Sequence, residues 1–399
     1  MKKTYAINGK KWEVMSTKVL IITTISGFLA KFEMNDVKIL QNSGCTIHYA
    51  TNFQTPIYED RKEELKERGI QLHQIDIQKS PFKLKKNMKA LFQLVEIIKR
   101  EQINMIHCHN PMGGVLGRVA AILAGKKIYV IYTAHGFHFY KDAPVKNWLL
   151  YYPIEKILAR FTDTIITINH EDFSCAKKFQ MKKNGRVVYI PGVGIDVKKF
   201  TRRSECYQTE RKKWNIPSEA FHIVSVGELN ENKNHEIIID ILKNPNMKDV
   251  YYTICGKGVK ESELRKKIEN SNLNKRVQLL GYRTDIEMVL QSADCFAFPS
   301  KREGLGIAAL EALACGIPIV ATDNRGTREY VIHNRNGYLC DLNVKEQYEN
   351  AILRLKNDKQ KCDEMKVVCV KTADRFSIKA TDKIMRSVYK NALERCKKI

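Results

Sequence analysis

The sequence lacks the marks of a secreted or membrane-embedded protein. Its eleven cysteines are scattered and none forms a Cys-x-x-Cys pair, which argues against a disulfide framework. The first residues, MKKTYAINGKKWEV, have no apolar core of signal-peptide length. No run approaches the roughly 18 apolar residues of a membrane-spanning helix. We therefore expect a reduced, cytoplasmic protein whose contact with a membrane is peripheral.

Acidic residues are strongly outnumbered by basic ones. The chain has 44 Asp and Glu against 68 Lys and Arg, which gives a formal net charge of +24. Such an excess favours a polyanionic partner: nucleic acid, an anionic membrane or a phosphorylated substrate. The basic residues are dispersed and no recognition motif occurs, so we do not expect nucleic acid. With no low-complexity tract and 44% hydrophobic residues, the 399 residues suffice for about two globular domains.

Apolar, β-branched runs alternate with stretches of helical spacing. KVLIITTISG (18–27) predicts a strand and a glycine turn, and residues 32–44 predict a helix. Further strands are expected at 46–52, 104–110, 127–136, 162–169, 221–227, 250–258, 276–281, 294–300 and 318–323. Further helices are expected at 82–100, 113–125, 145–160, 234–243, 260–270 and 305–315. This alternation predicts an α/β protein with two Rossmann-like lobes, each a doubly wound parallel sheet.

The boundary between the lobes is expected in VVYIPGVGIDVKKF (187–200), which has one proline and two glycines. We place the N-terminal lobe at 1–197, the C-terminal lobe at 198–375, and at 376–399 a last helix that packs back on the N-terminal lobe. Ligands of parallel sheets bind beyond the carboxyl ends of the strands. The loops ending at five small residues are therefore expected to face one central cleft: Gly27, Gly136, Gly227, Gly258 and Ser300.

The stretch PSKREGLGIAALEALACGIPIVATD carries two glutamates eight positions apart, separated by a pair of glycines. Gly304 and Gly306 leave room for backbone amides to approach an oxyanion, and a helix beginning near Leu305 adds its positive dipole end. In the simplest interpretation, Glu303 only complements that dipole and Glu311 is a solvated helix acid. Apolar neighbours of Glu311 oppose this, because they bury the helix and a buried carboxylate needs a partner.

Four motifs resemble those of the family-4 retaining glycosyltransferases with the two-lobed GT-B fold. They are YTAHGFHFY (132–140), YIPGVGIDVKKF (189–200), SVGELNENKNH (225–235) and REGLGIAALEALACGIPIVATDNRGTREYV (302–331). The resemblance covers about residues 18–390 and points to bacterial capsular and exopolysaccharide glycosyltransferases. It implies that a sugar moves from a nucleotide-sugar, UDP-linked by analogy, to a lipid-linked or saccharide acceptor with retention. The N-terminal lobe would bind the acceptor and the C-terminal lobe the donor.

The resemblance also assigns roles to single residues. It implies that Glu311 binds the ribose hydroxyls, that Glu303 contacts the donor sugar and that Lys233 pairs with the diphosphate. His135 would lie beside the donor sugar, so Glu303 and His135 are the catalytic candidates. The other implied donor contacts are Gly27, Gly281, Tyr282, Gly304, Leu305 and Gly306. Without the resemblance, a histidine at a strand end is more often structural and a loop lysine is more often a solvated charge.

One position departs from the family pattern. Many members have an arginine after the glycine that ends the first strand of the second lobe, and this chain has Glu228. An arginine fork suits a diphosphate, whereas a carboxylate cannot replace it. Either Lys233 and Arg302 neutralise the leaving group, or Glu228 has another task.

No metal and no cofactor are expected besides the nucleotide-sugar. The sequence has no Asp-x-Asp motif, and amides, a helix dipole and a lysine suffice to stabilise a departing nucleoside diphosphate. The histidines of HCH (107–109) should share one face of a strand, but two ligands are too few for a metal site. No nucleophile for double displacement is evident, so we favour departure of the leaving group on the face that the acceptor attacks.

Residues 80–100, SPFKLKKNMKALFQLVEIIKR, predict a basic amphipathic helix at an anionic membrane surface. A packed surface helix with solvated lysines is the alternative. By analogy, the acceptor is a saccharide linked to polyprenyl diphosphate at the inner face of the cell membrane. Loops of the N-terminal lobe would turn three further candidates toward it: Asn110, Phe137 and His138.

Two other functions fit part of the sequence. A nucleotide-sugar 2-epimerase has the same fold and binds the same donor without an acceptor, but the E-x7-E loop and the GVGID hinge resemble those of transferases. A catalytically silent nucleotide-sugar-binding protein is supported only by Glu228.

Overall fold

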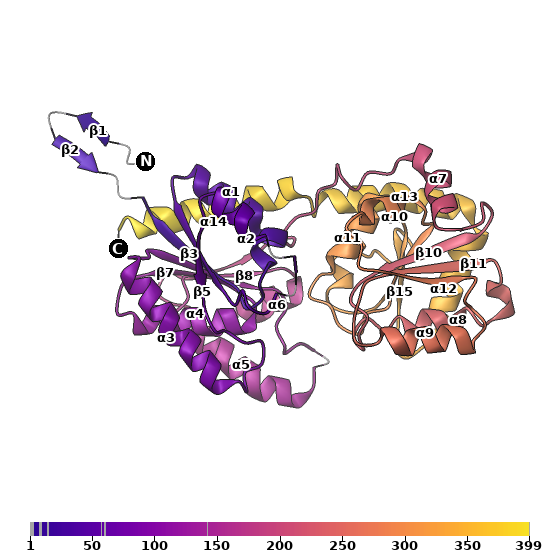
Figure 1. The fold of residues 1–399 in the computed structure, drawn as a ribbon, viewed down its shortest axis with the longest axis horizontal. Coiled ribbons are helices and arrows are strands. Elements are labelled where there is room, and N and C mark those ends of the chain that lie inside the picture. Colours follow the sequence, from indigo (N-terminus) through magenta and orange to yellow (C-terminus); the bar gives the residue numbers. More distant parts are fainter. Residues whose placement is uncertain are drawn as a thin grey trace. The chain divides into compact units, whose positions relative to one another are not determined.

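The structure is a computed structural model in which the chain forms two compact units. It describes residues 4–7, 10–13, 16–56, 58–59, 61–141 and 143–398. The first unit comprises the chain up to Val193 together with the residues from Thr381 onward, and the second comprises Gly194–Ala380. Each unit is built on one parallel sheet, and a separate antiparallel pair, β1 (Thr4–Ile7) and β2 (Lys10–Glu13), precedes them (Figure 1).

The sheet of the first unit has the strand order β5-β4-β3-β6-β7-β8-β9. Its strands are β3 (Lys18–Ile22), β4 (Thr46–Thr51), β5 (Gln71–Gln74), β6 (Met105–His109), β7 (Tyr129–Ala134), β8 (Thr164–Thr167) and β9 (Arg186–Tyr189). The inner strands are buried, as a sheet covered on both faces requires, and β3 and β8 are rich in β-branched residues. The expected linker was wrong at its start, because Val187 to Tyr189 pair with β8 as an edge strand.

Helices cover both faces of this sheet. They are the π-helix η1 (Leu29–Glu33), α1 (Met34–Asn42), α2 (Lys62–Glu67), α3 (Leu84–Arg100), α4 (Pro111–Leu123), α5 (Val145–Ala159) and α6 (His170–Ala176). Helices α3, α4 and α5 lie along one face, with α4 in contact with both neighbours (Figure 1). Among the described residues, no helix is long and apolar enough to cross a membrane.

The last helix, α14 (Ile378–Cys396), completes the first unit. The Tyr389 hydroxyl donates to Asp36 Oδ2 at 2.7 Å, and Arg395 Nη1 donates to the carbonyl oxygen of Asn184 at 2.7 Å. Tyr389 is fully buried. The end of the chain is therefore part of the core formed by its beginning.

The second unit repeats the architecture with the strand order β12-β11-β10-β13-β14-β15. The strands are β10 (Phe221–Val226), β11 (Val250–Cys255), β12 (Val277–Gly281), β13 (Cys295–Phe298), β14 (Ile319–Thr322) and β15 (Gly337–Cys340). The helices are α7 (Tyr207–Lys213), α8 (Glu236–Ile241), α9 (Glu261–Asn270), α10 (Ile286–Gln291), α11 (Ile307–Ala314), α12 (Lys345–Asn357) and α13 (Lys359–Asp374). Helix α11 begins two residues later than expected, because Gly306 has a φ of 96°, which a right-handed helix does not allow.

Candidate functional site

Just beyond the carboxyl ends of β10, β11 and β12, backbone hydrogen bonds that involve glycines join the three segments. The amide of Gly227 donates to the carbonyl oxygen of Cys255 at 2.9 Å, and the amide of Gly256 donates to that of Gly281 at 2.7 Å. A Cβ at Gly256 would lie 1.8 Å from the Gly227 oxygen, so only glycine allows this approach. The packing fixes the loop that begins with Gly227 and Glu228 and carries Lys233.

Lys233 and Glu303, two of the predicted site residues, form an ion pair. Lys233 Nζ lies 2.6 Å from Glu303 Oε1, and their side chains are only 20% and 12% exposed. The ammonium also lies 4.9 Å from the centroid of the Phe298 ring. The surrounding loops are joined by hydrogen bonds from Lys301 N to Asn232 O and from Asn232 Nδ2 to Arg302 O. Two motifs 70 positions apart thus meet in one site of the second unit.

The glycine loop between Glu303 and α11 is tightly packed. A Cβ at Gly306 would lie 2.6 Å from the Phe298 ring and 2.9 Å from the Tyr330 hydroxyl. Leu305 is buried, so its side chain supports the loop and only its backbone is available to a ligand. Glu311 follows on the second turn of α11 and is half-buried. In the second unit, an amide-bearing loop therefore separates the two carboxylates, as the spacing predicts.

The remaining candidates of the second unit are more exposed. The side chains of Glu228 and Arg302 are exposed, and that of Tyr282 is 54% exposed. Gly281 has a φ of 67°, in the left-handed region that favours glycine, and ends β12 beside the Gly256 amide. The exposed ring of Tyr282 follows directly, where it is available to an aromatic base.

In the first unit, His135 belongs to a buried cluster. His135 Nε2 lies 3.1 Å from His109 Nδ1 and 3.9 Å from Glu33 Oε1, and His109 Nδ1 lies 3.5 Å from the same oxygen. Burial lowers the pKa of His135 to about 4 and holds that of His109 well below its usual range. Both imidazoles are therefore neutral at pH 7, which suits hydrogen bonding rather than charge pairing.

A hydrogen-bond chain adjoins this cluster. Because Tyr389 donates to Asp36, it accepts from His107 Nδ1 at 2.8 Å, and His107 Nε2 then accepts from Thr133 Oγ1 at 2.7 Å. Burial, and after it Asp36, raises the pKa of Glu33 well above its usual range. Burial raises the pKa of Asp36 to about 7. Asp36 is therefore partly protonated near neutral pH, and the pKa of Glu33 is shifted in the same direction.

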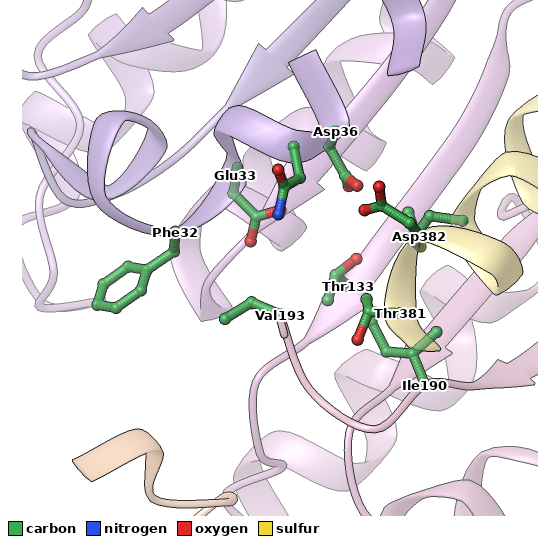
Figure 2. A pocket seen from close by; sticks show the side chains of 10 residues that line it. Phe32, Glu33, Asp36, Thr133, Ile190, Val193, Thr381 and Asp382 are labelled. Atoms are coloured by element: carbon green, nitrogen blue, oxygen red, sulfur yellow. The ribbon is translucent and has the colours of Figure 1, made fainter. Parts of the chain in front are cut away.

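A cavity of about 10 Å³, room for roughly one water, lies against these acids. Figure 2 shows Glu33 and Asp36 on one side and Thr133, Thr381 and Asp382 on the other. Glu33, His109 and His135 bring three ligand atoms within 4.8 Å of one another. The histidines of HCH share one face, as expected, with His107 and His109 rings 4.1 Å apart. The group that could hold an ion thus takes only His109 from this pair, and Glu33 is a member that the sequence did not reveal. The absence of a metal stays a prediction.

The other candidates of the first unit have clear packing roles. Gly27 has a φ of 78°, and a Cβ there would lie 2.8 Å from Tyr58 Cβ. Asn110 is buried and its Oδ1 accepts from the Thr24 amide at 3.2 Å. The Phe137 ring is 3% exposed and belongs to the core, so packing accounts for it. His138 is half-buried against the Tyr151 ring at 4.6 Å.

The comparisons with known proteins agree with these motifs. Residues 207–368 match the model described as "Glycosyl transferases group 1", and residues 18–169 match "Glycosyl transferase 4-like". The chain is 36% identical to EpsD of Bacillus subtilis (strain 168), which is named as a glycosyltransferase, over 94% of this chain and 97% of the relative. The chain belongs to the glycosyltransferases of group 1.

Solved structures show that this glycosyltransferase has the GT-B fold. HepE of Anabaena, solved in complex with UDP, superimposes with a TM-score of 0.75 at 19% identity, covering 94% of this chain and all of HepE. WaaG, described as involved in lipopolysaccharide biosynthesis, gives a TM-score of 0.70 at 14% identity, covering 93% and 99%. A further relative, an Escherichia coli UDP-Gal:alpha-D-GlcNAc-diphosphoundecaprenol alpha-1,3-galactosyltransferase, is 31% identical over 69% of this chain and 72% of its own.

Several buried polar residues of this glycosyltransferase escaped the sequence interpretation. Glu33, Asp36 and Tyr389 surround the histidine cluster, and the Tyr330 hydroxyl lies beside the glycine loop without a hydrogen-bond partner among the described residues. The only signal was two acids three positions apart in a predicted helix. That spacing places both on one helix face, but it does not show that the face is buried.

Proposed function

We propose that this glycosyltransferase moves a sugar, a hexose or an N-acetylhexosamine, from a UDP-linked donor to a saccharide carried on polyprenyl diphosphate. The proposal rests on its 31% identity to the Escherichia coli enzyme, whose name specifies a UDP-linked donor and a diphosphoundecaprenol acceptor. Transfer takes place on the cytoplasmic face of the cell membrane, where such donors are available, and contributes to a capsular or exopolysaccharide.

The second unit is proposed to bind the donor. The Lys233–Glu303 ion pair supplies both a cation for the diphosphate and a carboxylate for the sugar hydroxyls. Glycine amides at 304 and 306 approach the distal phosphate, and Glu311 accepts hydrogen bonds from the ribose. Gly281 and Tyr282 contact the base. In this arrangement Lys233 and the exposed Arg302 balance the charge that Glu228 adds.

We expect the anomeric configuration to be retained because the acceptor attacks the same face of the sugar from which the nucleoside diphosphate departs. The bond from the anomeric carbon to the phosphate oxygen breaks, and the acceptor oxygen bonds to the same face of the sugar. The acceptor proton passes to the departing phosphate, so no enzyme nucleophile and no metal take part. Lys233 and the loop amides stabilise the charge that develops on the diphosphate. His135, neutral at pH 7, orients the donor sugar by a hydrogen bond.

Helix α3 is proposed to bind the anionic membrane surface. Its packing face consists of Asn87, Ala90, Leu91, Leu94, Ile97 and Ile98, all buried. A second apolar stripe at i, i+4 and i+8 stays exposed: Leu84 is 73%, Met88 52% and Phe92 63% exposed, with Phe82 before them. Packing within the first unit does not explain this stripe, and flanking lysines add about 1 kcal/mol each near anionic lipid.

Helix α5 extends the same surface. Val145, Leu149 and Ile157 are exposed, with the Trp148 ring at the edge of the same helix. Because α4 contacts both α3 and α5, the two helices that carry these exposed side chains cover the same side of the sheet (Figure 1). Exposed apolar side chains on nearby helices with basic residues among them are typical of peripheral membrane binding.

Labelled UDP-sugars incubated with the protein and polyprenyl-linked lipid extract test the proposal. We expect label in the lipid phase, with the anomeric configuration retained by NMR and turnover unchanged by EDTA. Interconverted nucleotide-sugar without lipid product would support an epimerase, and binding without turnover would support the silent alternative. EDTA-sensitive turnover restored by zinc would contradict the metal-free mechanism and make Glu33, His109 and His135 the first residues to test as its ligands.

A further inference from the structure

A larger cavity, of about 360 Å³, opens in the first unit beside the amino end of α3. Its lining residues are Thr24, Thr55, Pro56, Ile77, Gln78, Lys79, Ser80 and Lys83. The volume lies within the range of roughly 300–1,000 Å³ that is usual for small-molecule sites. None of the donor-binding or catalytic candidates predicted from the sequence lines it, although Ser80 and Lys83 belong to the predicted membrane-binding segment.

The position of the cavity follows from the strand order. Thr24, Thr55 and Ile77 each lie a few residues after the carboxyl end of one of three adjacent parallel strands, β3, β4 and β5. Ligands of such sheets bind in the crevice beyond the carboxyl ends of the strands. This cavity is therefore where the architecture of the first unit favours a ligand.

The walls of the cavity are fixed before any ligand arrives. Asn87 of α3 is buried; its Oδ1 accepts from the Gln78 amide at 2.8 Å and its Nδ2 donates to Ser80 O at 2.9 Å. On the other wall, the Gly113 amide donates to Thr24 Oγ1 at 2.8 Å. These bonds hold the segment that carries Lys79 against the helix that follows Lys83.

The residues that line the cavity are suited to a ligand that has both a negative charge and hydroxyl groups. Lys79 and Lys83 supply two cations, and none of the eight described lining residues is acidic. Thr55, Ser80 and Gln78 supply neutral hydrogen-bonding groups, which suit a sugar. Two flexible ammonium groups with neutral donors fit the spread charge of a diphosphate bonded to a saccharide.

We propose that this cavity binds the diphosphate and first sugar of the lipid-linked acceptor. The inference rests on the proposed function and names the acceptor site within it. Phe82 and Leu84, on either side of Lys83, are 83% and 73% exposed and begin the membrane-binding stripe. The polyprenyl chain stays in the bilayer beside that stripe while its head group enters the cavity. One helix end thus supplies both the lipid contact and the phosphate contact.

Calorimetric titration with farnesyl-diphosphate-linked N-acetylglucosamine, a short-chain acceptor analogue, tests this without vesicles. Replacing Lys79→Ala and Lys83→Ala together should weaken its binding by about tenfold or more, because two charge-assisted contacts are lost. The matched control Lys126→Ala with Lys127→Ala removes the same charge from an exposed loop of the first unit, outside the cavity and the membrane-binding stripe, and should change the Kd by less than about twofold. Thr55→Trp should block binding by filling the cavity without changing charge.

Parallel measurements separate the possible failures. If UDP does not bind the wild-type protein, the proposed function fails. If UDP binds but the analogue binds the Lys79/Lys83 variant and its control equally well, only the acceptor site is refuted. Anionic vesicles without acceptor should bind wild type and Thr55→Trp alike. If Thr55→Trp instead loses vesicle binding while analogue binding persists, the cavity holds a lipid head group and the proposal is overturned.

Discussion

Lys233 and Glu303 show how a site can depend on a single pair of residues. Both side chains are largely removed from water, so each charge is compensated mainly by the other side chain. In the proposed donor site, a bound diphosphate gives the ammonium an anionic partner and leaves the carboxylate to accept from sugar hydroxyls. The pair is thus both a structural contact and the basis of the proposed donor site.

Lys233→Ala should lower both stability and donor affinity. Glu303 would keep a poorly solvated charge without its partner, so we expect a loss of about 1–3 kcal/mol in the free energy of unfolding by urea. The Kd for UDP should rise about tenfold or more. The control Lys301→Ala, which breaks the more exposed pair with Glu231, should cost less than about 1 kcal/mol. Unchanged UDP affinity would remove Lys233 from the donor site.

Glu311→Gln should weaken nucleotide-sugar binding and leave the fold intact. The amide keeps the shape of the side chain but accepts hydrogen bonds from ribose without a charge, which should cost roughly tenfold to a hundredfold in Kd by calorimetry. Glu269→Gln makes the same change on an exposed position of α9 and should have no effect. If the two variants bind the donor equally well, Glu311 does not hold the ribose.

His222 should make the second unit sensitive to acid. It is fully buried, with Nδ1 donating to Ser292 O and Nε2 accepting from Thr253 Oγ1, and burial lowers its pKa to about 4. Below about pH 6.5 the unfolded chain takes up a proton that the folded histidine refuses, so stability falls as the pH drops toward 4. From pH 7 to 5 the loss should be about 2 kcal/mol from this group.

The variant His222→Gln provides the comparison for this titration. It should be less stable at pH 7, but its stability should depend less on pH between 7 and 5 when urea unfolding is measured at both. An identical pH dependence in both proteins would show that other groups cause the acid sensitivity.

At the scale of elements, α3 is unusual because it has two apolar faces. One face packs on the sheet of the first unit and the other is exposed beside lysines, of which Lys89 pairs with Asp76 at 2.9 Å. A helix that only had to cover the sheet would need a polar outer face. We therefore attribute the exposed stripe to the proposed membrane contact.

Replacing Met88→Gln and Phe92→Gln should reduce sedimentation with phosphatidylglycerol vesicles by roughly tenfold or more, since each lost side chain contributes about 1 kcal/mol or more of transfer free energy. The control Val367→Gln with Val370→Gln changes two exposed apolar residues of α13 and should leave vesicle binding unchanged. Changing Lys85 and Lys86 to Ser should weaken binding further at low salt. Undiminished binding of the α3 variants would refute this helix as the anchor.

At the scale of the whole molecule, the last helix packs against the unit formed by the first part of the chain. Helix α14 belongs to the first unit although it follows the second unit in the sequence. Tyr389 fixes the position of this helix, because its hydroxyl hydrogen-bonds to both Asp36 of α1 and His107 of β6. The last helix therefore supports the buried cluster that contains the catalytic candidate His135.

Tyr389→Phe should destabilise the first unit by about 1–3 kcal/mol, because buried Asp36 and His107 each lose a hydrogen-bond partner. Chemical denaturation measures the loss, and Tyr282→Phe, at an exposed ring, should cost less than about 0.5 kcal/mol. An equal effect of both variants would show that α14 is held by apolar packing alone.

Much of the architecture could be predicted from the sequence. Inner strands such as β3 and β13 are mostly apolar runs, since a strand covered on both faces buries side chains on both. The edges were harder. β5 (Gln71–Gln74) is polar and part-exposed, and the residues of β9 were predicted as linker, because an edge strand has one neighbour and less need of apolar side chains.

The sequence by itself determined the two parallel-sheet units, the glycine loop and the spacing of Glu303 and Glu311, because these follow from local periodicity and backbone conformation. Only the tertiary structure decided that Glu303 pairs with Lys233, that Glu33 joins His109 and His135, and that a cavity opens beside Lys83. The physical reason is that strand order, set by packing across the whole sheet, brings loops together that lie far apart in the chain.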